Sequence, residues 1–369
     1  MDERVREHAD VLVDWSARIE PGDDVVVDVA EGAHDLAVAV AERLGEVGAN
    51  LTVTYGSDEV TRAYLRASDA EFGTAEGELA LFENADAYLR LGGGRNTAAT
   101  ADVGAETRRA YSRARTDIRE ARMDTDWVST VHPTRSLAQA AGMAYEEYRE
   151  FVYDAVLRDW ESLAGEMAQV KALLDDGDTV RIVTERDDRP RTDVTMSIAG
   201  RSAVNSAASV AYDSHNLPSG EVFTAPYDTT GEVFFDVPMT VNGRRVQDVR
   251  LVFEGGEVVE CEAATGEEAI EAVLDTDPGA RRLGELGIGM NRSIDRFTDN
   301  ILFDEKMGDT VHLALGRAYD ANLPAGESGN DSAVHVDLIT DLSTASRIEI
   351  DGETIQRDGV FRFEEEFEK

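Results

Sequence analysis

The spacing of the apolar residues changes near Gly177, and this change limits the possible folds of the chain. Before it, apolar runs of buried-strand type alternate with amphipathic helices, as in VVVDV (25–29), AHDLAVAVAERLGEVG (33–48) and NLTVTY (50–55). A strand, a helix and a second strand in this order predict a parallel pair with a right-handed crossover. Residues 1–176 are therefore predicted to form an open α/β domain, whose last helix ends near Asp176.

After Gly177 the apolar residues alternate in period two, and glycine-rich turns separate the segments. TVRIVTE (179–185), DVTMSIAG (193–200) and GEVFFDV (231–237) follow this pattern. NG and GG dipeptides between such segments are typical of hairpins. Residues 177–369 are predicted to form a mixed α+β domain rich in antiparallel strands. The expected fold class is thus an α/β domain followed by an α+β domain.

The chain is strongly acidic, with 75 acidic against 36 basic residues, a net charge of −39 and a pI near 4.4. The acids are spread between periodic apolar segments, which favours a folded protein with an acidic surface over disorder. Lys171, Lys306 and Lys369 are the only lysines. Concentrated salt would screen the repulsion among the acids, so we interpret the chain as an archaeal-looking halophilic protein. The same charge repels phosphates, so neither nucleic acid nor a membrane is expected as a partner.

Targeting and redox features point to the cytoplasm. Cys261 is the single cysteine, which leaves no partner for a disulfide within the chain. The N-terminal segment MDERVREHADVLVDW is charged and amphipathic, and it has no apolar signal-peptide core. No apolar run approaches the ~20 residues that span a bilayer. A cytoplasmic location is the expectation.

Two strand-like segments near the C-terminus carry residues that can bind metal or transfer protons. VHLAL (311–315) contains His312, and AVHVDLI (333–339) contains His335 and Asp337. Residues i and i+2 of a strand point to the same face, so His335 and Asp337 are expected to project together. Such a pair is a plausible metal-ligand or acid/base unit. As alternatives, His312 could be a core histidine, and Asp337 could simply orient His335.

Two glutamates lie upstream in segments rich in glycine and apolar residues. Glu221 directly follows the turn sequence NLPSG, and Glu285 lies within GARRLGELGIGMN. An unpaired carboxylate in such an apolar segment would be costly to bury. The structural alternatives are that Glu221 caps a turn and that Glu285 pairs with Arg281 or Arg282.

Taken together, these residues favour a metal site. Their segments are the least acidic of the chain, so solubility does not explain their carboxylates. Three carboxylates and two neutral imidazoles suit a pair of divalent ions such as Zn, Co or Mn. Two such ions can share a bridging water, lower its pKa and polarise a carbonyl. This combination indicates the hydrolysis of an amide or an ester.

Four segments of the second half resemble the thermophilic metalloaminopeptidase family, which is typified by aminopeptidase T, aminopeptidase S and PepS. They are NLPSGEVFTAP, LDTDPGARRLGELGIGMN, NILFDEKMGDTVHLALGRAY and SAVHVDLI, in this order. The first half is similar as well, with IEPGDDVVVDV, GANLTVTYGSDEVTRAYL and HPTRSLAQAAGMAYEEYREFVYDAV. The resemblance covers nearly the whole chain.

The resemblance implies a site for two divalent metal ions, with Mg possible beside Zn, Co and Mn. It places the metal ligands on Glu221, Glu285, His312, His335 and Asp337, and the tyrosine of the family's ALGRAY motif on Tyr319. It also implies a homodimer that hydrolyses peptides with a free N-terminus. Glu305, from the DE pair before the first histidine, is the hypothetical general base.

Two other functions compete with an aminopeptidase. One is a metal-dependent hydrolase of another amide, which would also accept substrates without a free amine. The other is a metal-binding scaffold protein without catalysis. Tyr319 and Glu305 disfavour the scaffold, because a purely structural site has no use for them.

Overall fold

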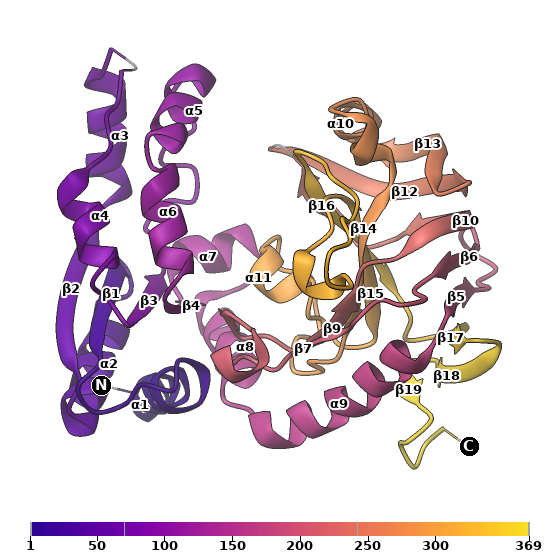
Figure 1. Cartoon of the computed structure of the whole chain (residues 1–369), viewed down its shortest axis with the longest axis horizontal. Coiled ribbons are helices and arrows are strands. Elements are labelled where there is room, and N and C mark those ends of the chain that lie inside the picture. The colour runs from indigo at the N-terminus through magenta and orange to yellow at the C-terminus, as the bar shows by residue number, and fades with distance from the viewer. Residues whose placement is uncertain (1, 70, 242, 368–369) are drawn as a thin grey trace. The chain divides into compact units, whose positions relative to one another are not determined.

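The computed structural model describes residues 2–69, 71–241 and 243–367, and the chain divides into two compact units (Figure 1). The first unit comprises Met1–Trp160 with Ala208–Pro218, and the second comprises Glu161–Ala207 with Ser219–Lys369. The units thus separate after Trp160, whereas the domain boundary expected after residue 176 stays a prediction. The predicted fold class of α/β and α+β parts is confirmed.

A parallel sheet forms the centre of the first unit. Within the described residues its order is β2-β1-β3-β4-β8. The predicted strand–helix–strand unit is confirmed, because β1 pairs in parallel with β2 and α2 connects them. Helix α2 buries Leu36, Val40 and Leu44 and ends at Gly48, whose φ of 88° lies in the left-handed region that favours glycine. The strands are β1 (Asp24–Ala30), β2 (Asn50–Gly56), β3 (Ala87–Gly92), β4 (Asp126–Val131) and β8 (Asn216–Leu217).

Short helices make up much of the rest of this unit. Helix α1 continues into a π-helical turn over Val11–Ser16. The helices are α1 (Glu3–Asp10), α2 (His34–Val47), α3 (Asp58–Ala67), α4 (Glu76–Phe82), α5 (Ala105–Arg113), α6 (Thr116–Met123), α7 (Arg135–Ala140) and α8 (Tyr145–Val156).

The second unit contains a large antiparallel sheet, as the period-two pattern predicted. Its described strands run in the order β11-β12-β10-β6-β5-β17-β18-β19, and β13 pairs with β12. They are β5 (Thr179–Thr184), β6 (Thr192–Ser197), β10 (Tyr227–Phe235), β11 (Met239–Val241), β12 (Arg244–Glu254), β13 (Glu257–Thr265), β17 (Ser346–Ile350), β18 (Glu353–Arg357) and β19 (Val360–Phe361). The helices are α9 (Trp160–Asp176), α10 (Glu267–Leu274) and α11 (Ile301–Asp304).

A second antiparallel sheet of this unit carries the residues of functional interest. Its described strands are β7 (Val204–Ser206), β9 (Glu221–Thr224), β14 (Leu283–Gly289), β15 (Thr310–Gly316) and β16 (His335–Asp341). Their order is β16-β15-β14-β9-β7. Every residue of β14 and β15 is buried, which explains their apolar sequences. The strands expected for VHLAL and AVHVDLI are confirmed as β15 and β16.

Candidate metal centre

The register of the second sheet brings polar side chains from neighbouring strands to one face. Ala314 of β15 lies opposite Glu285 of β14 and also opposite Asp337 of β16. Residues that lie directly opposite each other in a sheet share a face. His312 and His335 each lie two residues before a member of this row, so the pleat turns them to the same face. The expected joint projection of His335 and Asp337 is confirmed.

Glycines of β14 make room for this cluster. Glu221, the first residue of β9, lies opposite Gly289, which shares a face with Glu285. Gly287 lies opposite His312, and a Cβ atom on Gly287 would collide with the ring atoms Cε1 and Nε2 of His312. The imidazole therefore lies over a backbone position that only glycine can occupy without displacing the ring.

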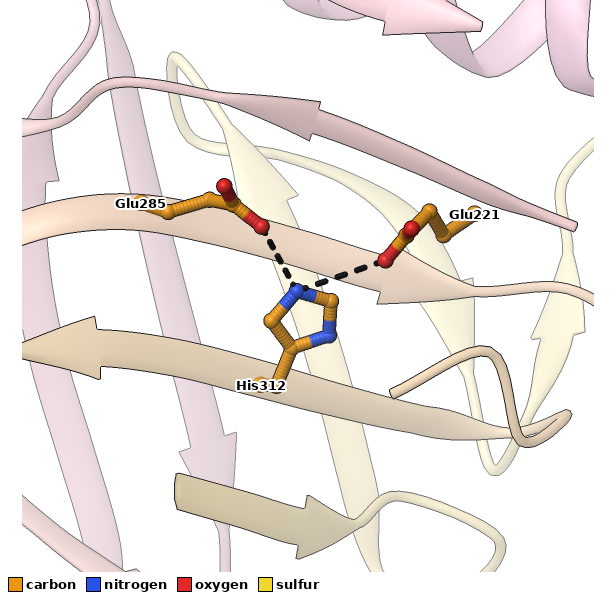
Figure 2. A group of neighbouring side chains, drawn as sticks. All are labelled: Glu221, Glu285 and His312. Atoms are coloured by element: carbon orange, nitrogen blue, oxygen red, sulfur yellow. Dashed lines mark hydrogen bonds and ion pairs between the residues drawn. The ribbon is translucent and has the colours of Figure 1, made fainter. Parts of the chain in front are cut away.

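The first cluster consists of Glu221, Glu285 and His312, whose candidate ligand atoms all lie within 4.8 Å of one another. His312 Nε2 lies 2.9 Å from Glu285 Oε1 and 3.5 Å from Glu221 Oε2. Figure 2 shows the two carboxylates approaching the same ring nitrogen from different strands. All three residues are buried.

The second cluster consists of Glu285, His335 and Asp337, again with candidate ligand atoms within 4.8 Å of one another. His335 Nε2 lies 3.5 Å from Asp337 Oδ1 and 3.8 Å from Glu285 Oε2. His335 Nδ1 donates a hydrogen bond of 2.9 Å to the carbonyl oxygen of Arg317. This bond orients the ring, so that Nε2 faces the carboxylates. Glu285 thus presents one oxygen to each cluster.

The pKa values at the centre reflect burial and the mutual attraction of opposite charges. Burial raises the pKa of Glu221, and Lys306 and His312 only partly offset this effect. Burial works against the charged form of both histidines, yet the neighbouring carboxylates raise the pKa of His312 and raise that of His335 to about 9. The pKa of Asp337 is lowered, because its bond to His335 and the charges of both histidines outweigh its burial.

Lys306 belongs to this site, although the sequence patterns did not single it out. Its side chain is fully buried, and Nζ lies 3.5 Å from Glu221 Oε1. The same ammonium group contacts Glu305 Oε1. A buried lysine is rare unless it is paired with an acid. The signal was present in the sequence, because this chain uses lysine at only three positions, and Lys306 directly follows Glu305.

The two candidate catalytic residues lie at different distances from the clusters. The Tyr319 ring centroid is 5.0 Å from that of His335 and 6.1 Å from that of Phe223. Burial, followed by the charges of Glu285 and Asp337, raises the pKa of Tyr319, so its hydroxyl keeps its proton. Glu305 is a member of neither cluster, and it is connected to the site through its contact with Lys306.

The structural alternatives for Glu285 are not realised. Arg281 pairs with Asp275 at 2.7 Å, and Arg282 pairs with Glu257. Glu285 instead contacts His312 and His335. The alternative of His312 as an ordinary core histidine is weakened by the two carboxylates that face its Nε2.

The residues fit a divalent metal centre. Glu221 Oε2 is buried and accepts no hydrogen bond from the described residues, although a buried carboxylate oxygen ordinarily needs a partner. Two imidazole nitrogens and three carboxylates converge, and this donor set suits Zn, Co or Mn. Together, the buried clusters, their shared glutamate and the tyrosine beside them define a centre of the metallohydrolase class.

Comparison with known proteins specifies this class further. The family model described as "Thermophilic metalloprotease (M29)" matches residues 1–361, and the chain belongs to this family. Aminopeptidase T of Thermus thermophilus is 28% identical over 386 residues, which cover 93% of each chain. Aminopeptidase T of Thermus aquaticus is 29% identical over 392 residues, which cover 95% of this chain and 94% of the relative. The solved structure "Wild-type AmpT from Thermus thermophilus" matches with a TM-score of 0.84 and 27% identity, covering 97% of this chain and 99% of the other.

These comparisons confirm the prediction of a hydrolase of the metalloaminopeptidase family. The family also supports divalent metal ions as cofactors, in agreement with the two clusters. Across residues 2–69, 71–241 and 243–367, no helix is both long enough and apolar enough to span a bilayer.

Proposed function

We propose that the chain is an aminopeptidase that hydrolyses the N-terminal bond of peptides at the metal centre of the second unit. One observation carries this proposal: two clusters of histidine and carboxylate share Glu285. Glu285 would therefore help to hold both of two divalent ions, one of them together with Glu221 and His312 and the other together with His335 and Asp337. Ions held in this way lower the pKa of water and polarise the carbonyl of the scissile bond.

Tyr319 is proposed to stabilise negative charge as it develops on the carbonyl oxygen of the substrate. Its ring packs beside His335, and burial together with the nearby carboxylates raises the pKa of the hydroxyl, which keeps it in the neutral, hydrogen-bond-donating form. A donor that is already in place for such an oxyanion is a strong catalytic device. Tyr319→Phe should leave the metal content unchanged and reduce kcat by about 10²-fold. An equal loss of metal would contradict this role.

Glu305 is the proposed proton carrier between the attacking water and the leaving amine. About 18% of its side chain is exposed, so it can exchange protons with solvent. Lys306 is proposed to position both acids. It holds Oε1 of Glu221, which leaves Oε2 of that carboxylate directed toward His312.

Selectivity for a free N-terminus is proposed to depend on the unprotonated α-amine, whose lone pair could serve as one more ligand at the centre formed by the two clusters. The amide nitrogen of an acylated peptide is a much poorer ligand. We further propose a homodimer in the cytoplasm of a halophile, with Zn, Co or Mn as the metal. The acidic composition supports the salt requirement. Stability that does not change between low and molar KCl would contradict it.

The proposal is tested with the metal-loaded chain in high salt, together with elemental analysis. Leucyl-anilide and its N-acetyl derivative are compared as substrates. An aminopeptidase should cleave only the free form. Equal cleavage of both would indicate a hydrolase of other amides, and bound metal without any hydrolysis would indicate a scaffold.

A further inference from the structure

A cavity of about 560 Å³ opens beside the second cluster, with His335 and Asp337 in its wall. Its volume falls in the range of small-molecule sites, roughly 300–1,000 Å³. The opposite walls come from β11 and from the segment that leads into α11. Large apolar side chains line much of it, namely Met239, Val241, Phe297, Ile301 and Ile339.

Two further carboxylates of the wall already have partners. Asp299 Oδ2 accepts a hydrogen bond of 3.1 Å from Thr240 Oγ1, and Asp299 Oδ1 lies 3.5 Å from Arg245 Nη1. Asp304 Oδ1 accepts hydrogen bonds from the backbone N–H and the hydroxyl of Thr298. Asp304 Oδ2 accepts a further hydrogen bond from the backbone N–H of Asn300, so both oxygens of Asp304 are occupied, and Arg245 offsets the charge of Asp299.

One part of the apolar wall is held in place by a cation–π contact, and another part is exposed to solvent. The guanidinium carbon of Arg245 lies 5.0 Å from the centroid of the Phe297 ring, which holds the ring by a cation–π contact. Ile301 is 46% exposed, which is unusual for so large an apolar side chain. An apolar group that enters the cavity would cover the side chain of Ile301 and remove its surface from water.

We propose that this cavity receives the side chain of the substrate's N-terminal residue and selects large apolar side chains over basic ones. This inference rests on the proposed function, because the scissile bond must lie at the neighbouring metal centre. Leucyl and phenylalanyl substrates gain apolar contacts that an alanyl substrate lacks. An arginyl side chain would lose hydration without gaining an ion pair with an unpaired acid of the cavity wall.

The first experiment compares kcat/KM of the metal-loaded chain for leucyl-, phenylalanyl-, alanyl- and arginyl-anilides. One methylene in an apolar pocket changes kcat/KM by about 10-fold or more. Leucyl and phenylalanyl substrates should therefore exceed both alanyl and arginyl substrates at least about tenfold. A preference for the arginyl substrate, or equal values for all four, would overturn the proposal.

A charged variant locates the selectivity in this cavity. Ile301→Asp places an uncommitted carboxylate at the rim, and its site at the start of α11 tolerates an acid. The leucyl-to-arginyl ratio of kcat/KM should fall about tenfold or more. Val259→Asp is the matched control, because Val259 is 50% exposed on β13 and does not line the cavity. An unchanged ratio in Ile301→Asp, or an equal fall in both variants, would contradict the proposal.

Binding measurements separate this inference from the proposed function. Leucine hydroxamate and arginine hydroxamate share the metal-binding group and differ only in the side chain. Calorimetry should show tighter binding of the leucine compound to the chain and a smaller difference for Ile301→Asp. If no anilide is cleaved, the proposed function fails, but a retained preference for leucine hydroxamate would still support the cavity. Equal affinities would overturn the cavity assignment even in an active enzyme.

Discussion

The first unit buries His8 and His132, the second unit carries His312 and His335 at the two clusters, and these two pairs differ in what surrounds them. In the first unit His8 is fully buried, and its Nε2 lies 2.8 Å from Thr130 Oγ1. Burial, with a smaller effect of His132, lowers the pKa of His8 to about 3. Burial also lowers the pKa of His132. In the second unit the pKa values of His312 and His335 are raised.

The difference lies in the neighbouring acids and not in the depth of burial. His312 is as completely buried as His8, but two carboxylates approach its Nε2. Neither His8 nor His132 belongs to a cluster of three candidate ligands among the described residues. In this chain, the buried histidine that is a metal-ligand candidate among the described residues is the one that shares its space with carboxylates. We interpret the first pair as structural, because neither histidine has such a cluster around it among the described residues.

The sharpest test removes one histidine from each pair. His335→Gln should release metal and reduce turnover by roughly 10³-fold, because several kcal/mol of charge stabilisation is lost. His132→Gln is the matched control and should retain metal after dialysis. Elemental analysis and leucyl-anilide assays measure both effects. Metal loss from His132→Gln, or a full metal content in His335→Gln, would invalidate the comparison.

The next test moves a ligand without removing it. Gly287→Ala would place a methyl group against the His312 ring and displace it from Glu285. Misplacing a ligand in this way should weaken metal binding by about 10–100-fold. Gly165→Ala in α9 is the control, because its Cβ would meet nothing within 4 Å and should leave affinity unchanged. Competition with a chelator gives both affinities. A Gly287→Ala chain with normal metal affinity would show that His312 is not a ligand.

The role of Gly287 shows a limit of what local sequence patterns can predict. The glycines of LGELGIG are visible in the sequence, and any strand over this segment would place Glu285 and Gly287 on one face. That His312 lies opposite Gly287 depends on the pairing of β14 with β15, which is set by contacts far apart in the sequence. The same limit applies to β8, which joins the parallel sheet of the first unit although it follows β5, β6 and β7 in the chain.

Local sequence patterns were sufficient to predict much of the rest of the fold. The parallel β1–α2–β2 unit and the antiparallel strands followed from periodicity alone, because burial of one face imposes it. Lys306 was missed because a lysine carries no pattern by itself, and its burial against Glu221 becomes visible only in three dimensions. Glu305 was proposed from chemistry, and its contact with Lys306 connects it to the site only indirectly.

A third test removes the buried cation beside Glu221 of the first cluster. Lys306 opposes the rise in the pKa of Glu221, so Lys306→Met should raise that pKa further. Metal binding needs the ionised carboxylate and should weaken about tenfold at pH 6, with partial recovery at pH 8. Lys171→Met is the control, because Lys171 forms only a half-exposed pair with Asp175 on α9. A pH-independent change in affinity would assign Lys306 a purely structural role.

The smallest expected effect concerns the first pair and depends on pH. The folded chain keeps His8 neutral down to about pH 3, whereas the unfolded chain protonates it near pH 6.5. The unfolded state therefore binds more protons between these values, and His8 lowers stability by up to about 1.4 kcal/mol for each pH unit below 6.5. This contribution is absent in His8→Gln. The free energy of unfolding of this variant should therefore fall less steeply than that of the parent chain as the pH is lowered.

In the metal-free chain, the second pair should change the pH dependence of the free energy of unfolding in the opposite sense. The pKa of His335 is raised to about 9, so its contribution is fully present below pH 6.5 and is lost as the pH rises through 9. Denaturant unfolding of metal-free His8→Gln and His335→Gln, each against the parent chain from pH 5 to 9 in high salt, measures both slopes. Differences of the same sign would mean that carboxylates do not distinguish the two pairs. Opposite signs would show that the acids beside His335 reverse the effect that burial has on the pKa of His8.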